Sequence, residues 1–338
     1  MKQIIFFIAL LSLISLSSCD KNPYHKKVSN IDVEYSILPF SADIQKLALD
    51  TTSRTENKLR EQYGQFFDTY MFDIRKNFDI QDTNRSAIAK QFVSDHWIAD
   101  LYVLSDSSFN ANVSMYNQKI HNALQYYKYY FPTREIPQFC TFITGVNYSM
   151  AIDSNLIAIG IDKYIGADCG LYASMNMESY IRKNLRPEKL VPDLMRTMAE
   201  SDFPNAFTED YLLSKMIQCG RYQYFVKCML PDEPDSVLWG YSAKQMEFCE
   251  KSEGEFWKYF VGSGNLLFTT DYMIQKRFLD DGPFTVVFSK DSPSRVGQWI
   301  GFKIVESYMH NNPEKTLEDL FMISSSQEIM SKAKYNPK

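Results

Sequence analysis

The chain has 338 residues, of which 45% are hydrophobic and 23% are charged, and this composition is typical of a folded globular protein. The formal net charge is −5, and lysine and arginine do not gather into a basic block along the folded part of the sequence. Because proteins that bind DNA or RNA neutralise phosphates with clustered cations, the composition argues against nucleic acid as a partner.

The N-terminus is predicted to be a lipoprotein signal peptide covering residues 1–18. A positively charged start precedes an almost wholly apolar run over residues 4–16, which is shorter than the roughly 20 apolar residues of a membrane-spanning helix. Small residues and a cysteine follow in the order of a lipobox, so we expect cleavage directly before the cysteine, whose sulfur carries the lipid. The lipobox residues are Leu16, Ser17, Ser18 and Cys19.

A lipid on Cys19 would hold the mature protein on a membrane, since two or more acyl chains give stable attachment. The polar residues 19–30 are predicted to form a lipidated tether, and residues 31–338 a single globular domain, because no repeat or linker interrupts them. The predicted localisation is the cell envelope, facing the periplasm, with the inner and the outer membrane both open. An ordinary secretory signal with a chance cysteine is the alternative.

A predominantly helical α+β fold is expected. Apolar residues recur at spacings of three and four in the first part of the chain, which predicts helices over 41–49, 54–74, 86–104 and 117–130. Two runs rich in β-branched and aromatic residues, 139–144 and 156–161, predict neighbouring strands of a small sheet within residues 138–164, packed by helices.

The helical pattern returns after the sheet, over 188–200, 207–229, 242–249, 253–260, 292–309 and 317–330. The clearest start is Ser292–Pro293, a capping residue before a proline suited to the first helical position. That helix is expected to bury Val296, Trp299, Ile300, Ile304 and Tyr308.

Five cysteines remain beyond Cys19, an odd number without regular spacing, so at least one thiol is expected to be free unless it pairs with another chain. Cys219 and Cys228 are predicted to share one helix, where they would lie too far apart to form a disulfide.

No catalytic residue, metal site or cofactor is predicted. The four histidines form no HExxH motif, and no CxxC occurs. Gly240–Lys244 lacks the second glycine of a nucleophile elbow and is better explained as a helix start capped by Ser242. Asp79, Asp82 and Asn84 lack the glycine and the final glutamate of a calcium loop.

Two functional alternatives stay open. A glycan or peptide hydrolase needs only a pair of suitably spaced carboxylates, which the 41 Asp and Glu residues could supply. A glycan-binding or peptide-binding lipoprotein would use the abundant tyrosine and phenylalanine rings for stacking, although most of these rings are expected in the core.

Several segments resemble the gliding-motility lipoprotein family GldB of Bacteroidota, and the most specific is Arg295-Val-Gly-Gln-Trp-Ile-Gly301. Further matching segments are 129–132, Asp162 with Tyr164 and Gly166, 191–193, Met216–Ile217 with Gly220, 230–231, Gly240–Tyr241, Trp257 with Tyr259–Phe260, and Lys334–Tyr335. The resemblance implies a membrane-anchored role beside other envelope proteins of gliding motility and type IX protein secretion, without established catalysis.

A second resemblance concerns the fold, since two strands followed by helices are similar to zincin-type metallopeptidases. In that family one helix carries HExxH and a later helix carries a ligand glutamate. Here these positions fall near residues 196–200 and Cys219–Gly220, and the ligands are missing. The resemblance therefore implies a degenerate zincin-like fold, a pseudo-peptidase whose cleft could still hold a polypeptide.

Arg295, Gln298 and Trp299 are the candidate partner surface or structural motif. The structural interpretation comes first, because Trp299 fits the buried helix face and Arg295 could pair with Asp291 or another carboxylate. The functional interpretation places the three side chains on a surface that binds a partner or a peptide.

Overall fold

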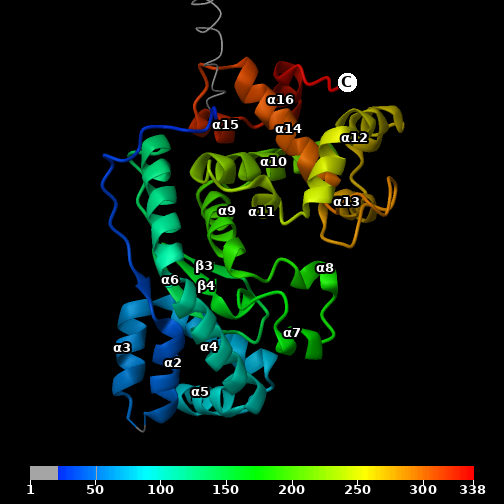
Figure 1. Cartoon of the computed structure of the whole chain (residues 1–338). Coiled ribbons are helices and arrows are strands. Elements are labelled where there is room, and N and C mark those ends of the chain that lie inside the picture. The colour runs from blue at the N-terminus through cyan, green and yellow to red at the C-terminus, as the bar shows by residue number, and fades with distance from the viewer. Residues whose placement is uncertain (1–21, 51) are drawn as a thin grey trace, which may run out of the picture.

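The computed structural model describes residues 22–50 and 52–338 (Figure 1). The predicted signal peptide and Cys19 lie outside these residues. A small sheet occupies the middle of the molecule, with α2, α3 and α5 at one end and α14, α15, α16 and the C-terminus at the other (Figure 1). None of the helices in the described part combines the length and the apolar composition needed to cross a bilayer.

Five helices precede the main strands. They are α2 (Phe40–Leu49), α3 (Arg54–Tyr63), α4 (Gln65–Asn77), α5 (Arg85–Ser94) and α6 (His96–Tyr130). The single helix predicted over 54–74 is wrong, because Gly64 adopts φ +56° and separates α3 from α4. Glycine reaches this left-handed region without the steric penalty of a β-carbon.

The boundary between α5 and α6 also differs from the prediction. Asp95 starts α6, since its carboxylate accepts hydrogen bonds from the backbone N–H groups of Trp97 and Ile98. The helix then continues through residues 105–116, which are rich in serine and asparagine and were not expected to be helical. Burial of Ser105 and Tyr116 against the body outweighs their weak helix propensity.

The sheet has four strands in the order β1-β2-β4-β3. The strands are β1 (Ile37–Leu38), β2 (Gln138–Phe142), β3 (Met150–Asp153) and β4 (Leu156–Gly160). β2 pairs in parallel with both β1 and β4, whereas β3 runs antiparallel to β4. The predicted neighbouring strands are thus confirmed as β2 and β4, and the two short outer strands are additions.

Helices dominate the chain after the sheet. Their bounds are η1 (Ile161–Lys163), α7 (Gly170–Ser174), α8 (Ser179–Arg182), η2 (Pro187–Lys189), α9 (Leu190–Asp202), α10 (Leu212–Met229), α11 (Asp235–Trp239), α12 (Ala243–Gly262), η3 (Leu266–Phe268), α13 (Tyr272–Leu279), α14 (Val296–Asn311), α15 (Leu317–Met322) and α16 (Ser326–Ala333). The predicted helices 242–249 and 253–260 are one helix, and 317–330 is two.

The start predicted at Ser292–Pro293 is wrong by three residues. Ser292 is buried, and its hydroxyl donates to the backbone oxygen of Ser289 at 2.7 Å instead of capping a helix. Arg295 is the residue before α14. The predicted buried face of this helix is confirmed, since Val296, Trp299, Ile300, Ile304 and Tyr308 are all buried.

The helices α10 and α14 cross in close contact. Gly220 on α10 faces Gly301 on α14, and a β-carbon added to either residue would overlap the backbone of the other helix. The two glycines therefore let the backbones touch at the centre of the C-terminal core. Cys219 and Cys228 both lie on α10, as predicted, and all five described cysteines are free.

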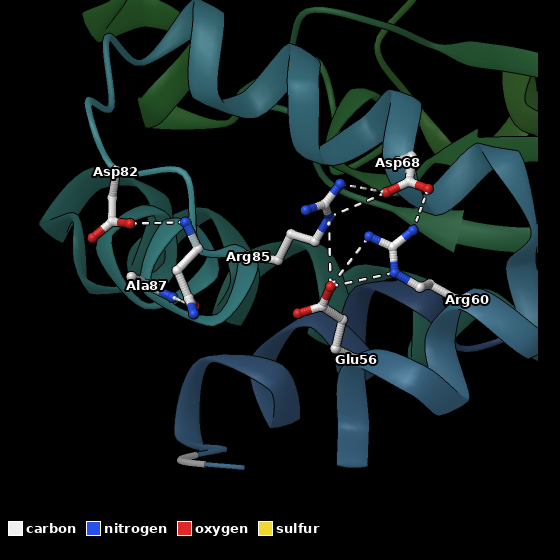
Figure 2. Close-up of polar contacts among 7 residues, drawn as sticks. Glu56, Arg60, Asp68, Asp82, Arg85 and Ala87 are labelled. Carbon is white, nitrogen blue, oxygen red and sulfur yellow. Dashed lines mark hydrogen bonds and ion pairs between the residues drawn. The ribbon is translucent and has the colours of Figure 1, made fainter. Parts of the chain in front are cut away.

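A network of four charged side chains ties α3, α4 and α5 together (Figure 2). Asp68 of α4 accepts from Arg60 at 2.5 Å and from Arg85 at 2.9 Å. Glu56 pairs with the same two arginines, at 3.2 Å and 3.7 Å. Two cations and two anions balance here, so the network stabilises the end of the molecule opposite α14 without leaving an unpaired charge.

Figure 2 also shows the segment that was compared with a calcium loop. The Asp82 carboxylate accepts the backbone N–H of Asn84 at 2.8 Å, and the Asn84 side chain accepts that of Ala87 at 3.1 Å. These oxygens therefore form a turn and the cap of α5.

Residues 22–36 form a strap along the outside of α6 (Figure 1). Tyr24, Val28 and Val33 are buried, and the backbone oxygen of Ile31 accepts a hydrogen bond from Gln125 at 2.9 Å. Part of the segment predicted as a tether, residues 22–30, thus lies against the body. Tyr24, Val28 and Val33 are isolated among polar residues and form no apolar run that would predict packing, yet each is buried against the body.

Candidate functional site

The positions that the metallopeptidase resemblance assigns to metal ligands meet where α9 lies beside α10. Arg196 of α9 donates through Nε to Glu200 Oε1 at 2.9 Å, one helical turn away. The Arg196 guanidinium also lies 5.8 Å from the ring centre of Tyr222 on α10. An ion pair and an aromatic ring thus lie where α9 meets α10.

The electrostatics of this junction do not favour a metal cation or a reactive thiol. Burial acts against the charged form of Arg196, but the ion pair with Glu200 holds its pKa above the usual value, so the guanidinium stays positive. Burial raises the pKa of the Cys219 thiol, although Arg196 opposes the shift. A protonated thiol is a poor nucleophile and a poor ligand. Within residues 22–50 and 52–338, no group of three or more His, Cys, Asp or Glu side chains is arranged to hold a metal ion.

Arg295 lies near this junction at the start of α14. Its φ of +62° places it in the left-handed region. The guanidinium donates to the backbone oxygen of Trp239 at 2.7 Å, and its Nε lies 3.0 Å from Asp281 Oδ1. The carboxylate partner is thus Asp281 and not the suggested Asp291. Arg295 also stacks over the Tyr241 ring, 5.4 Å from its centre.

Gln298 and Trp299 make contacts of the same kind. Gln298 Nε2 donates to the backbone oxygen of Leu279, at the end of α13, at 2.6 Å. Trp299 is 3% exposed, and its ring centre lies 5.2 Å from that of Trp239. Arg295, Gln298 and Trp299 therefore join α14 to α11 and α13, which favours the structural interpretation of the motif.

Replacing Arg295 with alanine is expected to lower the free energy of unfolding by about 2 kcal/mol, because a hydrogen bond from a charged donor to a buried carbonyl contributes roughly that much. Thermal or urea unfolding of the purified domain measures it. Lys251→Ala, which removes an exposed pair with Glu247, is the control and should change stability by less than about 0.5 kcal/mol. Unchanged stability of the Arg295 variant together with lost function in cells would favour the partner surface instead.

A buried carboxylate organises the loop between β2 and β3. Asp162 is fully buried, and its Oδ2 accepts the backbone N–H groups of Thr144 at 2.9 Å and Val146 at 2.7 Å. Its Oδ1 has no hydrogen-bond partner in the described residues. Burial raises the pKa of Asp162 to about 6, against the effect of these two N–H groups. Gly145 and Val146 both have positive φ, so the carboxylate holds a strained turn in place.

The tyrosines do not form a stacking surface. Most are buried or half-buried, and the exposed ones are Tyr129 on α6, Tyr148 before β3 and Tyr272 on α13. These three lie on separate elements, whereas a glycan-binding platform needs exposed rings side by side. The glycan-binding alternative therefore gains nothing from their placement.

Sequence reasoning named Arg295 but missed its partners. Trp239 and Asp281 are 56 and 14 residues away from it, and the contact exists only because α11 and the segment after α13 pack on the start of α14. The role of Asp162 was also missed. The sequence offered two signals for it, a place among the family-like segments and an acidic residue directly after an apolar strand, but neither indicates which backbone groups it binds.

The family model for gliding motility protein GldB matches residues 21–337, which is nearly the whole chain. No curated protein and no solved structure matches this chain.

Proposed function

This chain belongs to the GldB gliding-motility family, and from that premise we propose that it is a lipid-anchored, non-catalytic component of the envelope machinery of gliding and type IX protein secretion. The family match over residues 21–337 carries the proposal. The lipobox at Cys19 supports the anchor, because it precedes a body that starts to pack at residue 22.

The non-catalytic part of the proposal rests on the junction of α9 and α10. Near the residues to which the metallopeptidase resemblance would assign metal ligands, the Arg196 guanidinium is held positive by its neighbours. Like charges repel, so activation of water by a metal is disfavoured at this place. The contacts of Arg295, Gln298 and Trp299 join α14 to α11 and α13 and so support a rigid body.

Deleting the gene in the native host is the test in cells. The expected result is loss of spreading on agar and reduced export of a type IX cargo, both restored by the wild-type gene. Cys19→Ala should fail to restore them, because the protein would no longer be held at the membrane. Normal motility, secretion and surface display in the deletion strain would overturn the proposal.

The absence of catalysis needs its own test. The purified protein beginning at Asp20, which keeps the packed residues Asn22 and Tyr24, is incubated with unfolded protein and with peptidoglycan, with and without zinc, and products are followed by mass spectrometry. No turnover is expected under either condition. Cleavage abolished by a single carboxylate substitution would instead establish the hydrolase alternative.

A further inference from the structure

The start of the strap is fixed to the body only a few residues after the predicted lipid. The Asn22 side chain donates to the backbone oxygen of Pro231 at 3.0 Å. Tyr24 is buried, and its hydroxyl donates to Glu306 Oε1 at 2.6 Å. Its ring meets that of Tyr224 edge-on, with the centres 5.6 Å apart. The chain is therefore held by α10 and α14 from residue 22 onward.

This attachment limits how far the body can stand from the membrane. Asn22 lies three positions after Cys19, and a fully extended chain spans at most about 3.6 Å per residue, so the reach is no more than about 11 Å. That length is comparable to the headgroup layer of one leaflet. A lipid at Cys19 would thus bring the body into direct contact with the bilayer.

We propose that the end of the molecule formed by residues 22–24, the C-terminal half of α14 and residues 334–337 is the membrane-contact face, and that it binds phospholipid headgroups. This inference rests on the lipid anchor of the proposed function. The opposite end, with α2, α3 and α5, then points away from the bilayer (Figure 1).

The chemistry of this face fits a headgroup. It contains a cavity of about 760 Å³, lined by three tyrosines and by Lys303, His310 and Lys334 among others. Tyrosine prefers the boundary between water and hydrocarbon, since its ring is apolar and its hydroxyl is polar. The tyrosines are Tyr24, Tyr224 and Tyr335.

Of the two lysines in the cavity wall, Lys334 has no paired carboxylate among the described residues. The carboxylates of Glu306 and Glu253 accept hydrogen bonds from tyrosine hydroxyl groups, at 2.6 Å and 2.9 Å, and Lys303 pairs with Glu306 at 2.6 Å. Lys334 is exposed and has no carboxylate within 4.0 Å in the described part of the chain. Its ammonium group can therefore reach a lipid phosphate.

The test compares the two ends of the full-length lipoprotein in vesicles. A fluorescent amino acid is introduced at Asn336, in the cavity wall, or at Gln81, an exposed residue at the far end. The vesicles contain phosphatidylethanolamine and phosphatidylglycerol at 3:1, with a nitroxide on some headgroups. Quenching at Asn336 is expected to exceed quenching at Gln81 at least threefold. Equal quenching, or stronger quenching at Gln81, would overturn the proposal.

Mass spectrometry of the same sample distinguishes failure of the membrane-contact face from failure of the lipid anchor in the proposed function. An unmodified Cys19 would remove the anchor and with it the localisation in the proposed function. A lipidated Cys19 with equal quenching at both ends would leave the anchor intact and refute only the contact face.

A spacer variant tests the headgroup contact itself. Twenty glycine and serine residues inserted after Lys21 remove the limit on distance, since such a linker spans roughly 25 Å on average. In the spacer variant, quenching at Asn336 is still expected to exceed quenching at Gln81. Adding Lys334→Glu to this variant should abolish the difference, whereas adding Lys58→Glu at the far end should leave it unchanged. Headgroup binding would be refuted if the quenching difference disappeared with the spacer alone, or if it persisted when Lys334→Glu was added.

Discussion

Replacing Gly301 with alanine is expected to lower the free energy of unfolding by about 3 kcal/mol or more, which is the top of the usual range for overpacking a core. The added β-carbon would overlap the carbonyl group of Met216 on α10. Backbone cannot rotate away as a flexible side chain can, so α10 and α14 would have to move apart. This separation would loosen the core around Trp299 and Ile300, which are both buried.

Urea unfolding followed by tryptophan fluorescence measures this loss, and failure of the variant to fold is its extreme form. The matched control is Gly262→Ala at the end of α12, where an added β-carbon meets no atom within 4 Å. Alanine favours helix over glycine by up to about 1 kcal/mol, so the control should be neutral or slightly stabilised. Equal stability of the Gly301 variant and the wild type would mean that the two helices do not cross so closely.

The helix that contains Gly301 could be predicted from the sequence, whereas the helix break at Gly64 could not. The spacing of apolar residues was enough to predict the buried face of α14, because burial on one side repeats every three to four residues. It could not predict the break at Gly64, since glycine within a helical pattern is compatible with either a helix or a turn. The family motif around Gly301 was recognised, but its physical role depends on Gly220, 81 positions away.

The strands show the same limit. β2 and β4 are buried apolar runs and were predicted, whereas β3 has only four residues and is partly exposed. A short strand at the edge of a sheet has too little alternation to stand out from a loop. Pairing with β4 creates β3, and that pairing depends on the turn at residues 153–155.

The candidate site was predictable in composition but not in geometry. The absence of an HExxH motif at 196–200 could be read from the sequence, while the ion pair of Arg196 with Glu200 and the aromatic contact with Tyr222 could not. Contacts between α9 and α10 depend on how the helices are rotated about their axes. That rotation is set by the packing of the whole core.

Replacing Asp162 with asparagine is expected to stabilise the protein at pH 7.5 and to change how stability depends on pH. Because the pKa of Asp162 is raised to about 6 in the folded chain, folding favours the protonated carboxyl group. The stability it contributes is fully present below the unfolded pKa near 3.8 and is lost as the pH rises through about 6. Asparagine stays neutral, and its amide oxygen can still accept from Thr144 and Val146.

The stability of Asp162→Asn relative to the wild type should therefore rise by about 2 kcal/mol between pH 4.5 and pH 7.5, since each pH unit across the titration corresponds to about 1.4 kcal/mol. Urea unfolding at several pH values measures this difference. Asp291→Asn is the control, because Asp291 is exposed and its carboxylate makes no hydrogen bond or ion pair within the described ranges. If the stability of Asp162→Asn relative to the wild type does not change with pH, as expected for the control, the pKa of Asp162 is the same in the folded and the unfolded chain.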